Sequence, residues 1–353
     1  MPTSWPSIVK QESASLKINL DNLIRKNLSN IAFVTIDGED AKDFDDAVFC
    51  VEHNDGYDLY VAIADVSLYV KPESSIDKEA INRGTSIYFP NFVIPMLPEI
   101  LSNNLCSLRP NEDRPSLVVK INLDKDCYLK KYNFFSAIIH SHARLTYTEV
   151  ENNSFESPLS NAVIDSLKNL KSLAHKRIAI KEERGAVRIH SKEHLIKIND
   201  DGTSKSISFR KNTFANQMIE ECMLLANECA ADLLNNRYGY APFRIHEEPD
   251  KLKLETLKKI LGGNVQLQNP QDPASQINSI SKKISAKDQL KQSLILQTMK
   301  RAEYSTENVG HFGLQLDQYC HFTSPIRRYP DLLTHRMIKS CIEDDDDYSG
   351  NKK

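Results

Sequence analysis

The chain has 353 residues, of which 40% are hydrophobic and 26% are charged, and its formal net charge is −3 at pH 7. This composition is ordinary for a soluble globular protein, no window approaches a transmembrane length, and the first residues do not resemble a signal peptide. Seven cysteines without a C-x-x-C pair favour reduced thiols in the cytoplasm over a disulfide framework or a zinc site.

The first 140 residues are expected to be rich in strands. Apolar and alternating runs indicate strands, and Asn54-Asp55-Gly56 is a turn signal between two of them. The expected elements are a lead-in segment with one short helix (1–30), strands at 31–36, 47–51 and 59–64, a helix at 76–84, an irregular proline-marked segment at 90–98, and strands at 116–123 and 131–140.

The remainder is expected to be helical. Helices are predicted at 162–183, 215–235, 252–261, 288–302 and 329–342. The clearest, 215–235, places Met218, Cys222 and Leu225 on one apolar stripe. The acidic tail 343–353 is predicted to be disordered. Strands followed by helices predict an α+β fold, in which an antiparallel-rich mixed sheet packs with helices in one domain at 31–342.

Six of the ten residues from 37 to 46 are acidic, and they lie between two predicted buried strands: Asp37, Glu39, Asp40, Asp43, Asp45 and Asp46. Clustered carboxylates repel one another unless a positive charge lies among them. A hard divalent cation such as Mg²⁺ suits oxygen ligands of this kind. With an arginine-rich loop elsewhere in the chain, the cluster indicates metal-assisted phosphodiester chemistry.

An acidic cluster can also be a solvated face or a calcium loop. A run of acids is usually a solvated face, but such a run rarely sits tightly between two buried strands. A calcium loop of the EF-hand type starting at Asp37 would need glycine at position 6 and glutamate at position 12. Lys42 and Val48 occupy those positions, which excludes an EF-hand.

A second polar segment lies near the other end of the chain, at His321-Phe322-Thr323-Ser324-Pro325-Ile326-Arg327-Arg328-Tyr329-Pro330-Asp331. Proline interrupts regular structure here, and arginine offers a fixed fork of donors to phosphate oxygens. Taken alone, the segment is also compatible with a helix N-terminus that carries two surface arginines.

Several ordered motifs together resemble the catalytic domain of the ribonuclease II and ribonuclease R exoribonucleases, and the bacterial ribonuclease R branch most. They are Thr35-Ile36-Asp37, Asp43-Phe44-Asp45-Asp46-Ala47, and the runs 61–67, 94–98, 311–314 and 323–327. The resemblance implies a hydrolase that degrades single-stranded RNA from the 3′ end and releases nucleoside 5′-monophosphates. It also implies Mg²⁺ as cofactor, with two ions expected and Mn²⁺ as an alternative.

The resemblance also implies roles for the acidic cluster and the arginine loop. Asp37, Asp43 and Asp46 match the aspartates that hold metal, and Asp45 matches an acid needed for cleavage at the second metal. Arg327 matches the arginine that stabilises charge developing on the scissile phosphate.

Further residues are expected to contact single-stranded RNA. Tyr88 matches an aromatic that stacks on bases, and Tyr147 and Glu220 match residues around the 3′-terminal nucleotide. Ser324 and Arg328 belong to the arginine loop and are expected to contact RNA with Arg327. No membrane association and no obligate protein partner are expected.

Two departures from the family pattern are visible. Ile189 falls where the family's second stacking aromatic is expected, so base clamping is expected to be weaker unless His190 substitutes. The OB-type and S1 domains that normally flank this region are not found, which leaves a fragment, an isolated domain or a naturally short form open. A non-catalytic RNA-binding relative and a DNA- or cyclic-nucleotide-directed phosphodiesterase remain as alternative functions.

Overall fold

The computed structural model describes residues 3–18, 20, 23–189, 194–199, 203–209, 212–262, 269, 271–285, 288–344 and 349–351. Its helices are α1 (Ser7–Ser15), α2 (Val66–Tyr69), α3 (Ser75–Arg83), α4 (Tyr147–Asn152), α5 (Asn161–Glu183), α6 (Phe214–Tyr238), α7 (Lys251–Leu257), α8 (Pro273–Lys283), α9 (Gln289–Thr298) and α10 (Tyr329–Asp344), with short π or 3₁₀ turns at Leu101–Leu105, Lys258–Gly262 and Phe312–Leu314. Its strands are β1 (Lys26–Asp37), β2 (Asp46–His53), β3 (Gly56–Ala64), β4 (Ile87–Tyr88), β5 (Val93–Ile94), β6 (Asp113–Leu123), β7 (Leu129–Thr146), β8 (His194–Ile198), β9 (Ser204–Phe209), β10 (Phe243–Ile245), β11 (Glu303–Ser305) and β12 (Ser349–Asn351).

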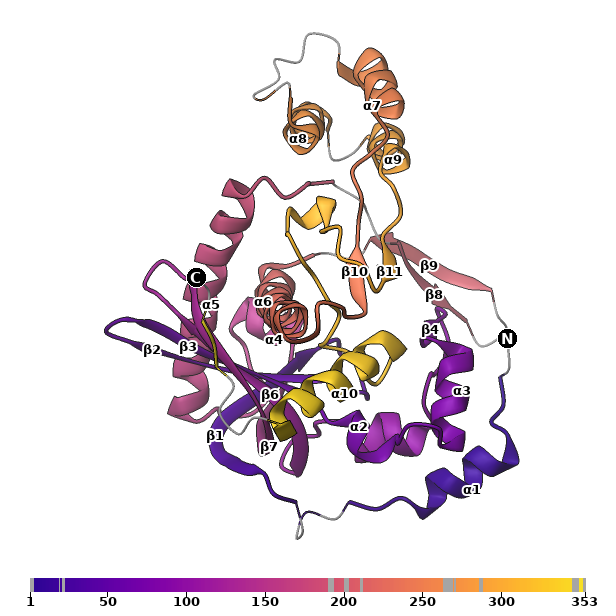
Figure 1. The fold of residues 1–353 in the computed structure, drawn as a ribbon, viewed down its shortest axis with the longest axis vertical. Helices are drawn as coiled ribbons and strands as arrows, with labels where there is room; N and C mark the ends of the chain where they lie inside the picture. The colour runs from indigo at the N-terminus through magenta and orange to yellow at the C-terminus, as the bar shows by residue number, and fades with distance from the viewer. Residues whose placement is uncertain are drawn as a thin grey trace. The chain divides into compact units, whose positions relative to one another are not determined.

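A six-stranded sheet with the order β1-β2-β3-β6-β7-β12 joins five strands from the first 146 residues with β12 from the C-terminal end (Figure 1). The strand β1 pairs antiparallel with β2 and also parallel with β7, in register Asp37↔Thr146, so the sheet from β1 to β7 closes on itself. Every other pairing in this sheet is antiparallel. The predicted antiparallel-rich mixed sheet in an α+β fold is therefore confirmed.

The predicted turn between β2 and β3 is confirmed, and its glycine is required. Gly56 has φ +142°, and a Cβ built on it would lie 2.0 Å from the carbonyl oxygen of Leu123. Only a residue without a side chain can adopt this conformation so close to a neighbouring strand. The register His53↔Gly56 follows from this tight connection.

The long helix α6 matches the predicted 215–235 helix and supplies much of the core. Thr213 caps its start in a reciprocal pair of bonds with Asn216, and Gly239 ends it with φ +73°. Met218, Cys222 and the rest of the predicted stripe are fully buried. All seven cysteines are free and buried, so they fill the core as small apolar groups.

The chain packs as two compact units, one of residues 1–177, 212–239 and 320–353, and one of residues 178–211 and 240–319. The first unit holds the sheet, with α5 hydrogen-bonded to β2 through Ser166 and Cys50. The second unit has its own apolar cluster, centred on buried residues of α7, α8 and α9, including Ile277 and Ile295.

Some boundaries differ from those expected. The strand β1 starts at Lys26, inside the predicted lead-in, and α9 ends at Thr298, where the chain turns extended at Met299 instead of continuing to 302. The helix α8 was not predicted. Within the predicted disordered tail, β12 pairs with the edge of β7, whose backbone groups offer hydrogen bonds there; residues 345–348 and 352–353 lie outside the described residues.

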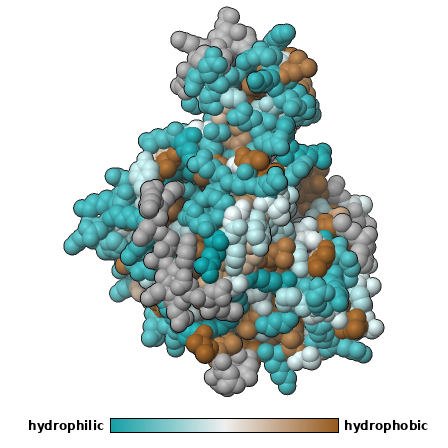
Figure 2. Space-filling model, viewed as in Figure 1, coloured by the Kyte–Doolittle hydropathy of each residue, from teal (hydrophilic) through white to brown (hydrophobic). Residues whose placement is uncertain are grey.

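The visible face of the molecule is mainly hydrophilic, with separate hydrophobic patches (Figure 2). Among the helices that the structure describes, none has the length and apolar character needed to cross a membrane.

Candidate active site

The acidic cluster lies at the end of the sheet where β1 ends and β2 begins. Asp37 is the last residue of β1 and Asp46 the first of β2, so two of the four predicted aspartates stand on paired strands. Asp43 and Asp45 lie on the loop that joins the strands. Because the loop returns the chain to the neighbouring strand, all four carboxylates are kept at one end of the sheet.

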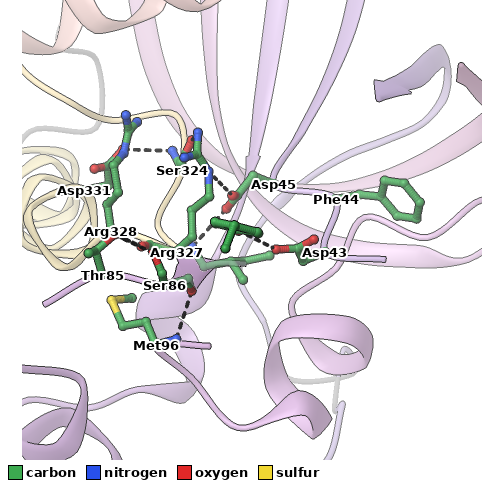
Figure 3. A network of polar contacts seen from close by, with 12 residues as sticks. Asp43, Phe44, Asp45, Thr85, Ser86, Met96, Ser324, Arg327, Arg328 and Asp331 are labelled. Atoms are coloured by element: carbon green, nitrogen blue, oxygen red, sulfur yellow. Dashed lines mark hydrogen bonds and ion pairs between the residues drawn. The ribbon is translucent and has the colours of Figure 1, made fainter. Parts of the chain in front are cut away.

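Asp45 joins this loop to the arginine loop (Figure 3). Its Oδ1 accepts a hydrogen bond from the backbone N–H of Ile326 at 2.9 Å, and its Oδ2 lies 3.8 Å from Nε of Arg327. The side chain of Asp45 is buried. Burial raises the pKa of Asp45 well above its ordinary range, and the Arg327 guanidinium opposes that shift. The two segments singled out from the sequence therefore form one site.

The arginine loop is fixed from within by Asp331. Its buried carboxylate accepts the N–H of Ser324 at 2.8 Å and a bond from Nη2 of Arg328 at 2.7 Å. Arg327 instead donates to Oγ of Ser324 at 3.0 Å, and its side chain is 43% exposed, against 19% for Arg328. The structure thus leaves Arg327 accessible to a ligand and uses Arg328 to hold the loop.

The hairpin of β4 and β5 is connected to both loops. The N–H of Ser86 and the hydroxyl of Thr85 both donate to the carbonyl of Arg327 at 2.9 Å (Figure 3). Two residues later, the hydroxyl of Tyr88 donates to Oδ2 of Asp43 at 3.2 Å. Tyr88 is half exposed, so its ring lies open beside the acidic cluster, as a stacking role requires.

The remaining carboxylates are short of positive partners. Burial and the charge of Asp43 raise the pKa of Asp37 to about 6, opposed by Arg144 and Arg327. Burial and the charge of Asp37 raise the pKa of Asp46 well above its ordinary range. Within the described residues, Oδ2 of Asp37 is buried and has no hydrogen-bond partner. A bound cation would offset the repulsion between the buried carboxylates and would also give the Asp37 oxygen a partner.

The donor set limits how an ion can be bound. In the part of the chain that the structure describes, no group of three His, Cys, Asp or Glu side chains could by itself hold a metal ion. Mg²⁺ keeps several waters and is usually bound through one or two carboxylates with substrate phosphates. The buried oxygen of Asp37 and its acidic neighbours fit an ion bound in this way, and not one enclosed by protein ligands.

Tyr147 and Glu220 lie on two helices that pack together. Tyr147 is the first residue of α4, capped by Thr146, and it directly follows the strand β7 that pairs with β1. Glu220 is exposed on α6, as expected from its place off the apolar stripe. Glu151 of α4 accepts the N–H of Ala215 at 2.9 Å, which ties the two helices together.

The position expected for a second stacking aromatic belongs to the other compact unit. Ile189 is partly buried and packs against the apolar cluster of that unit. His190, the expected substitute, lies outside the described residues.

Arg144 and Asp331 were missed in the sequence. Arg144 stands in β7 and bonds to the acidic loop, and Asp331 organises the arginine loop. An arginine four residues after the predicted strand at 131–140 gives no local signal of a loop 106 residues away. The order of charges in Arg327-Arg328-Tyr329-Pro330-Asp331 did allow an i,i+3 pair to be expected.

Known proteins resemble this chain along nearly its whole length. The model of the RNB domain family matches residues 25–344. Ribonuclease R of Escherichia coli (strain K12) is 41% identical over 367 residues, which cover 99% of this chain and 45% of that protein. The chain therefore spans less than half the length of that relative.

Solved structures show the same similarity. Mycoplasma genitalium RNase R in complex with ribose methylated single-stranded RNA matches with a TM-score of 0.89 and 36% identity, covering 95% of this chain and 54% of that one. The same protein in complex with double-stranded RNA matches with a TM-score of 0.91 and 36% identity, covering 98% and 63%.

Proposed function

This chain belongs to the RNB domain family, and on that basis we propose that it is a 3′→5′ exoribonuclease that hydrolyses single-stranded RNA to nucleoside 5′-monophosphates. The observation that carries the proposal is the junction between Asp45 and the loop of Ile326 and Arg327. It places an accessible guanidinium beside a cluster of carboxylates that lack sufficient positive charge. Phosphodiester hydrolysis needs both of these groups at one point.

Mg²⁺ is the proposed cofactor, as two ions, with Mn²⁺ as an alternative. Asp37, Asp43, Asp45 and Asp46 are the proposed ligands, and the orphaned oxygen of Asp37 supports the assignment. When bound, such ions supply a Lewis acid and an activated water. Because the described side chains do not enclose an ion, phosphate oxygens of the RNA and waters would complete the coordination.

Arg327 is proposed to stabilise the charge that develops on the scissile phosphate. Its guanidinium is partly exposed and is oriented by the hydroxyl of Ser324, while its backbone carbonyl is held by Thr85 and Ser86. A donor fixed in this way does not need to reorganise during the reaction, which is what makes electrostatic stabilisation effective. Arg328 supports this loop through Asp331 and is a weaker candidate for direct contact with RNA.

The RNA itself is proposed to be recognised without regard to sequence. The open ring of Tyr88 can stack on any base. Tyr147 and Glu220 are proposed to lie near the terminal sugars, where a 2′-hydroxyl both donates and accepts hydrogen bonds. We also propose a cytoplasmic location and no obligate protein partner; the seven free cysteines support a reducing compartment.

The test is incubation of 5′-labelled single-stranded RNA with the chain and Mg²⁺, with and without EDTA. The proposal predicts shortening from the 3′ end, nucleoside 5′-monophosphates by chromatography, and no cleavage in EDTA. RNA that binds but stays intact would indicate a non-catalytic relative. Equal cleavage of DNA, or cleavage of a cyclic nucleotide alone, would favour a different phosphodiesterase.

A further inference from the structure

One arginine outside the predicted site contacts the acidic loop near both of its ends. Arg144 lies in β7, opposite Thr35 of the parallel strand β1. Its Nη2 donates to the carbonyl of Gly38 at 2.9 Å and to the carbonyl of Glu39 at 2.6 Å. Its guanidinium carbon also lies 5.9 Å from the ring centroid of Phe44, the residue next to Asp45.

These contacts hold the first residues of the loop. Ser107 holds later ones, since it accepts the N–H of Phe44 at 3.0 Å and donates to the carbonyl of Lys42 at 3.0 Å. Residues 38–45 lie between two strands, outside the ladder of the sheet, and they carry several like charges. Thr148, at the start of α4, adds a bond from its hydroxyl to Oε1 of Glu39 at 3.2 Å. The segment that carries Tyr147 is therefore tied to the acidic loop at three points, and Arg144 makes two of them.

We propose that Arg144 is a positioning residue that holds the acidic loop in the conformation in which its aspartates bind a divalent cation. The proposal rests on the function proposed above. Arg144 reaches the loop through backbone carbonyls, and its guanidinium offers two donors in a fixed geometry that lysine cannot reproduce. Partners of this kind, which orient the groups around a metal, typically change metal affinity by about 10- to 100-fold when removed.

The hydrogen bonds and the positive charge of Arg144 have opposite expected effects on the affinity for a divalent ion. The guanidinium of Arg144 lies close to the carboxylates and repels Mg²⁺ or Mn²⁺, so removal of its charge alone would tighten ion binding. Loss of the hydrogen bonds would let the loop move and would weaken ion binding. Arg144→Met removes both the charge and the bonds, whereas Arg144→Lys keeps the charge and loses the fork.

The experiment is a titration with Mn²⁺ in the absence of RNA, in which free Mn²⁺ is followed by its electron paramagnetic resonance signal. The parent chain, Arg144→Lys and Arg144→Met are compared with Arg109→Lys and Arg109→Met. Arg109 is a half-exposed arginine that pairs with Glu112, and it serves as the matched control. Thermal unfolding of each variant without metal establishes that it is folded.

We expect both Arg144 variants to bind Mn²⁺ about tenfold more weakly than the parent, and both Arg109 variants to match the parent. Unchanged binding in Arg144→Lys, or tighter binding in Arg144→Met, would overturn the positioning role and leave the proposed function intact. If Arg144→Met does not fold, Arg144→Lys alone decides whether Arg144 positions the loop. A parent chain that binds no Mn²⁺ would overturn the proposed metal site and this inference with it.

Discussion

The backbone N–H of Ile326 donates to Oδ1 of Asp45 at 2.9 Å, across 281 positions of the sequence. This bond connects the loop after β1 with the loop before α10, and it is buried. A buried carboxylate that accepts a backbone N–H fixes the position of both segments. The side chain of Arg327, one residue further on, is thereby placed beside the acidic cluster.

The two adjacent arginines should respond differently to the same substitution. Arg327→Lys is expected to lower single-turnover cleavage at saturating RNA by about 100-fold or more, because a point charge cannot replace a fixed fork on phosphate. Arg328→Lys is expected mainly to destabilise the fold, by about 1–3 kcal/mol, because it leaves the buried carboxylate of Asp331 poorly paired. Urea unfolding and single-turnover rates of both variants check this. A full rate in Arg327→Lys would reduce Arg327 to a steering charge.

The ring of Tyr88 and its hydroxyl should have different effects, the ring on RNA binding and the hydroxyl on the Mg²⁺ requirement. Tyr88→Ala is expected to weaken RNA binding by about 1–3 kcal/mol through loss of base stacking. Tyr88→Phe should retain RNA affinity but require more Mg²⁺ for half-maximal cleavage, because the bond to Asp43 is lost. Fluorescence anisotropy and a Mg²⁺ titration of cleavage measure the two effects. Tyr128→Ala, at a similarly exposed tyrosine, is the control; equal losses in both alanine variants would argue against stacking.

A 2′-hydroxyl near the 3′ end should be required for cleavage. Tyr147 and Glu220 are carried by α4 and α6, which Glu151 and Ala215 join. Strands with a single 2′-deoxy substitution at successive positions from the 3′ end are the substrates. Cleavage is expected to slow when the substitution reaches the sugars next to these residues. Rates that are the same for every substituted strand would remove the sugar-reading role.

Acid should destabilise the first compact unit through a buried histidine. Burial lowers the pKa of His335 to about 4, so the folded unit binds its proton less readily than the unfolded chain. The contribution of neutral His335 to the free energy of unfolding is complete above about pH 6.5. It is lost as pH falls toward 4, by up to about 1.4 kcal/mol per pH unit. His335→Gln should flatten this dependence in urea unfolding, whereas His142→Gln, at an exposed histidine, should not. An unchanged slope in His335→Gln would assign the acid sensitivity to other groups.

Much of the fold could be predicted because the pattern is local. The strand β3 and the helix α6 follow from alternation and from a periodic apolar stripe, and Gly56 marks its own turn. The closure of the sheet could not be predicted in this way. It depends on β1 and β7 pairing over about 110 residues, and no local pattern encodes which distant strand becomes a neighbour.

In the candidate site, too, local features were predictable from the sequence and long-range contacts were not. The acidic run and the resemblance to the ribonuclease family identified the four aspartates and Arg327 as candidates, but not that Asp45 binds the arginine loop through the backbone of Ile326. A backbone donor leaves no mark in the sequence. Arg144 was missed for a related reason, since it reaches carbonyls of Gly38 and Glu39 and not a complementary charge. Supporting contacts of this type become visible only in three dimensions.

Metal-assisted cleavage at the acidic cluster is tested by comparing the single-turnover cleavage of saturating RNA by Asp45→Asn and by Asp40→Asn. Asparagine keeps an oxygen that can accept the N–H of Ile326, so the loop and RNA binding should persist while a charge at the proposed metal centre is lost. Asp40 is exposed in the same loop and is the matched control. We predict that Asp45→Asn slows cleavage about a thousandfold or more with RNA affinity retained, and that Asp40→Asn is unaffected. A rate close to that of the parent chain in Asp45→Asn would contradict metal-assisted cleavage at this cluster.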